Sequence, residues 1–181
     1  MGHYRARDLL LPPSLVSFLR APMAAAFPFV VDHPTAALSL LAMAAGSDVL
    51  DGYIARRFDQ ATPAGAVVDG LTDKLFAASV IATLFFTAHL NLLGVALLGM
   101  RELGEAPLVT WWAISRPRRK ARAEAPKANA PGKAATVLQF VAVAATLLHH
   151  AWTWPLLYAT GALGFVAAVS YWRRELANLA R

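Results

Sequence analysis

Residues 47–74 read SDVLDGYIARRFDQATPAGAVVDGLTDK, a stretch that concentrates acidic residues in an otherwise apolar chain. Five of the eleven acidic residues of the chain lie here, and four of them, Asp48, Asp51, Asp69 and Asp73, lie on two apolar arms. A short turn at residues 62–65 joins the arms. If both arms are helical and fold back on each other, the four carboxylates meet roughly 12–20 Å from the turn, at a rise of about 1.5 Å per residue.

The composition surrounding this stretch is that of a membrane protein. The chain has 181 residues, of which 57% are hydrophobic, and its mean hydropathy is +0.47. A soluble domain of this size needs fewer apolar residues. The chain has no cysteine, which excludes disulfides and thiolate metal sites.

Apolar segments near the length of a bilayer span predict an all-α integral membrane protein, a bundle of six transmembrane helices in one domain over residues 1–181. A short interfacial helix is expected within residues 1–12, where basic and apolar residues mix. Residues 116–133, rich in Ala, Arg, Lys and Pro, are expected to form a basic loop. The six expected spans are residues 14–31, 34–57, 66–90, 92–115, 134–150 and 152–172.

Basic residues divide strictly between the two sides of this bundle. With six spans, the termini and the loops 57–65 and 116–133 share one side, whereas the turns on the other side carry no Lys or Arg. The positive-inside rule makes the basic side, and hence both termini, cytoplasmic. The net charge of +6 is then explained by a rim facing anionic lipid, and no nucleic-acid partner is expected. The basic residues counted on this side are Arg5, Arg7, Arg57, Arg116, Arg118, Arg119, Lys120, Arg122, Lys127, Lys133, Arg173, Arg174 and Arg181.

The four aspartates require a cation. Ionisable groups inside membrane helices are costly and usually functional, and four neighbouring carboxylates repel one another unless a positive charge sits among them. The spacings i, i+3 (Asp48, Asp51) and i, i+4 (Asp69, Asp73) put each pair on one helix face. Oxygen ligands favour hard divalent ions, and four carboxylates suit two. The spacing alone leaves open a proton- or ion-coupled transporter, or salt bridges to Arg20 and Lys74.

Glycines flank the carboxylates and leave room for a large ligand. Gly52 follows Asp51, and Gly65 lies one turn before Asp69. Arg56, one turn after Gly52, could bind a phosphate in the same cleft. These residues favour a phosphate-containing substrate held on metal ions.

The same residues resemble a known signature. Asp48, Asp51-Gly52, Ala55-Arg56, an eight-residue gap, Gly65, Asp69 and Asp73 reproduce the pattern D-x-x-D-G-x-x-A-R-x8-G-x3-D-x3-D of the CDP-alcohol phosphatidyltransferases. The resemblance implies a homodimer of six-helix membrane subunits that moves a phosphatidyl group from CDP-diacylglycerol to an alcohol and releases CMP, with its active site facing the cytoplasm. It also implies that Asp48, Asp51, Asp69 and Asp73 bind two divalent cations, Mg²⁺ or Mn²⁺, that Asp73 is the general base, and that Gly52, Ala55, Arg56 and Gly65 border the CDP group.

Two shorter stretches bear on the acceptor. Residues 13–20, PSLVSFLR, and residues 132–139, GKAATVLQ, are similar to segments of bacterial phosphatidylglycerophosphate synthases, with substitutions at Ser14, Ser17 and Ala135. We expect Arg101, Lys133 and, less strongly, Arg20 to bind the phosphate of glycerol 3-phosphate, because these cations have too few acids nearby to pair with.

Several alternatives remain. Within the family, the acceptor could be phosphatidylglycerol, as in a cardiolipin synthase, or inositol or inositol phosphate. Outside it stand a cation- or proton-coupled transporter and a noncatalytic scaffold. The clustering of the acids near one face disfavours a transporter relay, and the complete signature disfavours a scaffold.

Overall fold

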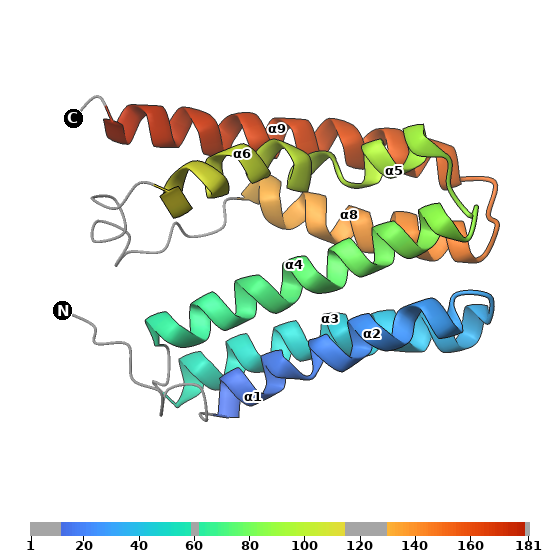
Figure 1. Ribbon diagram of the computed structural model, residues 1–181, viewed down its shortest axis with the longest axis horizontal. Helices are drawn as coiled ribbons and strands as arrows, with labels where there is room; N and C mark the ends of the chain where they lie inside the picture. Colours follow the sequence, from blue (N-terminus) through green and yellow to red (C-terminus); the bar gives the residue numbers. More distant parts are fainter. Residues whose placement is uncertain (1–11, 59–61, 115–129, 180–181) are drawn as a thin grey trace. The chain divides into compact units, whose positions relative to one another are not determined.

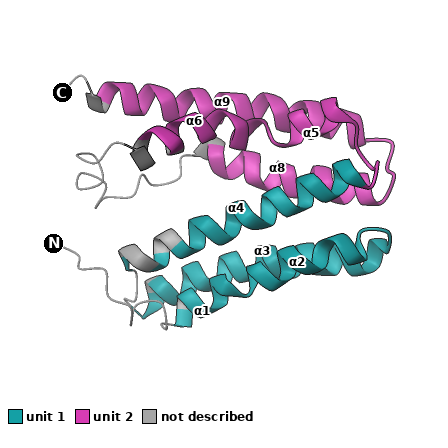
Figure 2. Ribbon diagram, viewed as in Figure 1, with its two compact units in different colours: residues 1–86 teal, residues 87–181 magenta. Residues whose placement is uncertain are grey.

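The computed structural model describes residues 12–58, 62–114 and 130–179. These residues fold almost entirely into α-helices, and no strand occurs among them. The helices form two compact units, residues 1–86 and 87–181 (Figure 2). The expected interfacial helix within residues 1–12 and most of the basic loop lie outside the described residues, and the single domain over 1–181 stays a prediction.

The first unit contains α1 (Pro12–Phe18), α2 (Arg20–Val30), α3 (Pro34–Arg57) and α4 (Pro63–Phe86). The helices α1 and α2 follow one another along the chain and pack against both α3 and α4 (Figure 1). Its core includes Phe27, Leu84 and Ala37, and the ring of Phe27 meets Phe76 edge-on, with centroids 6.4 Å apart.

Two prolines shape the first apolar segment. Pro22 has no N–H to donate to the carbonyl of Phe18, and the helix breaks at Leu19, whose N–H bonds to Val16 one residue short of the α-helical partner. Pro28 likewise cannot bond to the carbonyl of Ala24. That carbonyl instead accepts a 2.6 Å hydrogen bond from the hydroxyl of Ser79 in α4, and this bond links α2 to α4.

The helix α4 begins with a capped turn. Thr62 precedes Pro63 at the first helical position, and its hydroxyl accepts a 3.0 Å bond from the backbone N–H of Gly65. The turn predicted at residues 62–65 is therefore the cap and first turn of α4, which starts three residues before the expected span.

The second unit contains α5 (Leu92–Leu98), α6 (Met100–Ile114), α8 (Ala130–Leu147) and α9 (Thr153–Leu179). The helices α5, α6 and α8 all pack on α9 (Figure 1). Small residues permit this approach: a Cβ at Gly104 would lie 2.4 Å from Cβ of Ala168, and one at Gly161 would lie 2.7 Å from Leu97. The span expected over 92–115 is broken at Gly99, and Lys133, expected in the loop, lies in the first turn of α8.

Within the described part of the chain, two stretches are long and apolar enough to cross a membrane by length and composition, Pro34–Ala55 and Thr153–Ala177. Shorter apolar helices cover Ser14–Val30 and Gly132–Leu147. The all-helical class is confirmed, and the count of six spans stays a prediction.

Candidate active site

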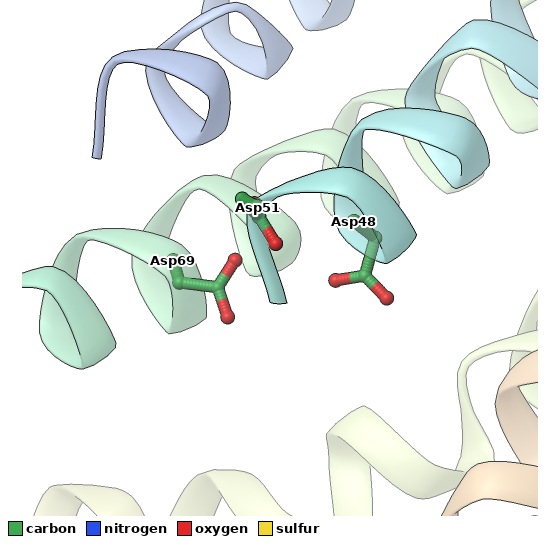
Figure 3. Close-up of side chains that lie close together, drawn as sticks. All are labelled: Asp48, Asp51 and Asp69. Atoms are coloured by element: carbon green, nitrogen blue, oxygen red, sulfur yellow. The ribbon is translucent and has the colours of Figure 1, made fainter. Parts of the chain in front are cut away.

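The four aspartates come together in the first unit, near the end that the charge distribution predicts to face the cytoplasm. Asp48 and Asp51 lie on α3, and Asp69 and Asp73 lie on α4. One carboxylate oxygen each from Asp48, Asp51 and Asp69 can be chosen so that all three lie within 4.8 Å of one another. Figure 3 shows these three carboxyl groups gathered at the facing sides of the two helices. The predicted convergence of the two arms is thus present in the structure.

A guanidinium group connects the two pairs of carboxylates. Nη2 of Arg20 donates to Asp48 Oδ1 at 3.2 Å and Asp51 Oδ2 at 2.7 Å, and thereby bridges the pair on α3. Nη1 donates to Asp69 Oδ1 at 2.8 Å and Asp73 Oδ1 at 2.6 Å, and bridges the pair on α4. The aspartates therefore meet through α2, which supplies the positive charge that their mutual repulsion requires.

Burial differs sharply among these five side chains. Arg20 is 2% exposed and Asp51 is 7% exposed, whereas Asp48, Asp69 and Asp73 are 54%, 40% and 49% exposed. The cluster thus has a closed floor made by Arg20 and Asp51 and an open side made by the other three carboxylates. A ligand can reach those three without unfolding the helices.

Serines on α1 and α3 complete the floor. Ser17 donates to Asp51 Oδ2 at 2.8 Å and to Asp69 Oδ1 at 3.5 Å. Ser47 accepts a 3.1 Å bond from Nε of Arg20 and donates to the carbonyl of Ala44 at 2.7 Å. Sequence reasoning did not identify Ser17 or Ser47 as site residues. A signal existed, because Ser14, Ser17 and Arg20 recur every third residue along an apolar segment and so share one helix face.

The expected role of Arg20 needs correction. The premise that Arg20 lacks acids to pair with is wrong, because four carboxylates contact it. The alternative of salt bridges between the aspartates and Arg20 is confirmed. The same premise is wrong for Arg101, which pairs with Glu102 at 2.9 Å and approaches Glu105 to 3.9 Å. Both acids were already visible one residue and one turn further along the sequence.

The remaining donor-site residues border the cluster in sequence. Gly52 and Ala55 are partly buried on α3, and the side chain of Arg56 lies outside the described part of the structure. Gly65 faces α1: a Cβ there would lie 3.2 Å from Oγ of Ser14 and 3.1 Å from Oγ1 of Thr62. The glycine thus permits close packing of the first turn of α4 on α1. This packing is a second reason for a glycine here, in addition to the expected room for a ligand.

A second polar cluster lies in the other unit, where α6 meets the start of α8. Arg101 donates to the hydroxyl of Thr136 and to the carbonyl of Gly132. Gln139 donates to Glu102 at 3.3 Å and to the carbonyl of Leu98 at 3.2 Å. Lys133 is exposed in the first turn of α8, next to Gly132. The structure therefore brings Arg101 to the end of α8 that carries Lys133.

Comparison with known proteins identifies the family of this chain. A family model described as CDP-alcohol phosphatidyltransferase matches residues 10–170. The chain belongs to the CDP-alcohol phosphatidyltransferase family. Both polar clusters lie within the matched residues, and so does the whole signature from Asp48 to Asp73.

Individual phosphatidyltransferases are similar over shorter stretches. The chain is 36% identical over 140 residues to the CDP-diacylglycerol–glycerol-3-phosphate 3-phosphatidyltransferase of Escherichia coli K12, covering 75% of this chain and 72% of that protein. The enzyme with the same name from Pseudomonas fluorescens is 38% identical over 109 residues, 56% of this chain and 55% of that protein. The CDP-diacylglycerol–inositol 3-phosphatidyltransferase of Candida albicans is 38% identical over 73 residues, 40% of this chain and 32% of that protein. The chain therefore spans about half the length of the Pseudomonas relative and a third of the Candida relative.

Proposed function

We propose that this phosphatidyltransferase transfers the phosphatidyl group of CDP-diacylglycerol to the hydroxyl of glycerol 3-phosphate and releases CMP. The observation that carries the proposal is the convergence of four aspartates from α3 and α4, in the family's spacing, on one partly open site. Such a site suits a reaction in which negative charge must be bound and then moved.

The donor set fits divalent cations. Carboxylate oxygens are the ligands that Mg²⁺ and Mn²⁺ prefer, and the oxygens of Asp48, Asp51 and Asp69 lie close enough to share an ion. We assign Asp48, Asp51, Asp69 and Asp73 as the ligands of two such ions. When bound, the ions would neutralise the charge that builds up on the departing CMP.

The residues of the chain would carry out the rest of the reaction. Asp73 accepts the proton of the acceptor hydroxyl, and the oxygen so freed attacks the β-phosphorus of CDP-diacylglycerol. The bond between that phosphorus and the oxygen bridging it to the α-phosphate breaks, and CMP departs with the bridging oxygen. Asp73 suits the role of base because it is half exposed, so an incoming hydroxyl can reach it. Gly52, Ala55, Arg56 and Gly65 border the CDP group.

The acceptor assignment rests on the second polar cluster. Lys133 is exposed at the first turn of α8, where helix N–H groups and the helix dipole favour an anion. Arg101 is held at the same end of α8 by Thr136 and by the carbonyl of Gly132. We assign Lys133 and Arg101 to the acceptor phosphate and leave Arg20 out of this pocket. Relatives named for glycerol 3-phosphate match a larger share of the chain than the relative named for inositol.

Exposed apolar side chains support a placement in the membrane. Phe29, Phe86, Leu92 and Val137 are 84%, 82%, 71% and 65% exposed, a pattern that suits lipid-facing helices. We propose a multi-pass protein of six spans, with a cytoplasmic active site and cytoplasmic termini, that works as a homodimer. The acyl chains of the donor would then stay in lipid while its head group meets the aspartates.

The test of this function is an acceptor panel. The purified chain in lipid nanodiscs receives CDP-diacylglycerol, Mn²⁺ or Mg²⁺, and one of glycerol 3-phosphate, inositol, inositol phosphate or phosphatidylglycerol. Mass spectrometry of the lipid products should find phosphatidylglycerophosphate as the main product. A product formed faster from inositol, inositol phosphate or phosphatidylglycerol would replace the acceptor assignment and keep the reaction.

A further inference from the structure

Arg20 is the largest fully buried side chain in the described part of the structure. Its side chain is 2% exposed, and its guanidinium nitrogens lie 2.6–3.2 Å from oxygens of all four aspartates. Arginine cannot lose its charge in a protein, and a buried arginine is stable only when it is paired and hydrogen-bonded. Four carboxylates and one guanidinium leave this cluster with a formal charge of −3 when all are ionised.

The oxygens that bind Arg20 belong to the same carboxylates that metal ligation would need. Each aspartate gives one oxygen to the guanidinium: Oδ1 of Asp48, Asp69 and Asp73, and Oδ2 of Asp51. A divalent ion binds carboxylate oxygen at about 2.0–2.6 Å. A guanidinium at 2.6–3.2 Å from the same four oxygens occupies part of that space, and its positive charge repels the ion.

We propose that Arg20 is the resident counter-cation of the aspartate cluster and competes with divalent cations for its carboxylates. In the metal-free protein Arg20 offsets one of the four negative charges and bridges the acids of α3 and α4. Metal binding requires some of these guanidinium contacts to be given up, so Arg20 sets the metal affinity of the site. The inference rests on the proposed function, because it takes the four aspartates as the metal ligands.

The residues around Arg20 determine how easily its guanidinium can leave the carboxylates. Its Nε is held by Ser47 Oγ at 3.1 Å, and Ser47 is itself held by the carbonyl of Ala44. Ser17 donates to Asp51 and so keeps one contact on that carboxylate when Arg20 moves. Asp51 and Arg20 form the closed floor, whereas Asp48, Asp69 and Asp73 remain open to an ion. Ser47 therefore acts as a positioning residue for the guanidinium.

Replacing Arg20 should change metal binding and stability in opposite directions. In Arg20→Gln the cluster carries four unneutralised carboxylates, so the apparent Kd for Mn²⁺, measured by isothermal titration calorimetry on the full chain in detergent, should fall at least tenfold. The melting temperature in EDTA should fall as well, and Mn²⁺ should restore it. A purely structural role would instead weaken Mn²⁺ binding, because a disordered site binds metal less well.

Two further variants keep the test decisive. Ser47→Ala removes one anchor of the guanidinium with little change in volume, and it should lower the Kd for Mn²⁺ in the same direction by a smaller factor. It decides the question if Arg20→Gln does not fold. Arg173→Gln removes the same charge from an exposed position on α9 and should leave both the Kd and the melting temperature unchanged.

Mn²⁺ affinity and CMP release test the two proposals separately. If Mn²⁺ binds Arg20→Gln or Ser47→Ala no more tightly than the wild type, the competition is refuted, even when the wild type releases CMP. If the wild type binds Mn²⁺ and releases no CMP with any acceptor, the function is refuted, while a tighter Kd in both variants still supports the competition.

Discussion

Asp73 differs from the other three aspartates in its proposed role. It is both a metal ligand and the base that takes the acceptor proton. Asp73→Asn keeps the shape of the side chain and removes the basic oxygen. General base catalysis contributes about 10²–10⁴-fold, so kcat for CMP release should fall by at least about 100-fold. CMP release at saturating substrates and Mn²⁺ measures this effect.

A matched control for Asp73→Asn is Asp32→Asn. Asp32 is exposed in the turn between α2 and α3, away from the cluster in sequence, and its replacement should leave kcat within about twofold of the wild type. If Asp73→Asn also stays within a few-fold of the wild type, Asp73 is not the base.

Lys133 is the residue that tests the acceptor pocket. Lys133→Ala removes a charge at the first turn of α8, so the apparent KM for glycerol 3-phosphate should rise about tenfold, and the KM for CDP-diacylglycerol should stay nearly unchanged. Lys133→Arg keeps the charge and should recover much of the lost affinity. An equal rise of both KM values in Lys133→Ala would remove Lys133 from the acceptor pocket.

At the residue scale, the sequence located the acids and left salt bridges to Arg20 and Lys74 open, but it did not single out Arg20 as the partner of all four. The spacings i, i+3 and i, i+4 put Asp48, Asp51, Asp69 and Asp73 on two helix faces, and the structure brings them together as expected. The position of Arg20 depends on how α2 packs between long-range neighbours, which local spacing does not specify. A helix break at Leu19, set by Pro22, fixes where the guanidinium enters.

At the scale of elements, the interruptions of the helices explain what the hydropathy pattern missed. The span expected over 34–57 has the bounds of α3, because no proline or glycine break divides it. The segments 14–31 and 92–115 each divide in two, at Leu19 and Gly99. Hydropathy averages over about 19 residues, so it detects the apolar segment and not the break within it.

Helix contact in the second unit depends on glycine. An added Cβ at Gly104 would lie 2.4 Å from Cβ of Ala168, so α6 and α9 must shift apart in Gly104→Ala. Such overpacking costs about 1–3 kcal/mol, and the melting temperature followed by tryptophan fluorescence in detergent should fall by several degrees.

Gly46→Ala is the matched control for Gly104→Ala. An added Cβ at Gly46 meets nothing within 4 Å, and alanine has the higher helix propensity. This variant should therefore be as stable as the wild type or more stable. A melting temperature of Gly104→Ala that equals that of Gly46→Ala would show that α6 and α9 do not pack as described.

For the whole molecule, the absence of cysteine makes the topology directly measurable. The charge distribution predicts that Ala151 lies outside the cytoplasm and that Arg173 lies inside. A membrane-impermeant maleimide should label Ala151→Cys in intact cells and Arg173→Cys only after the membrane is permeabilised. The reverse labelling pattern would place the active site on the opposite face.

Global organisation was only partly predictable. Composition gave the all-helical class, which the structure confirms, because apolar runs of this length have few other solutions. The partition into units at residues 86 and 87 was not predicted. The partition follows from which helices pack together. The helices α1 and α2 pack on α3 and α4, whereas α5, α6 and α8 pack on α9.

The central claim is that the aspartate cluster drives metal-dependent release of CMP. The most direct test measures CMP from the folded wild-type chain supplied with CDP-diacylglycerol and glycerol 3-phosphate, with Mn²⁺ or Mg²⁺ and then with EDTA. We expect one CMP for each phosphatidylglycerophosphate formed, and none when either the metal or the acceptor is withheld. Undiminished CMP release in EDTA, or no CMP with any acceptor and metal, would contradict it.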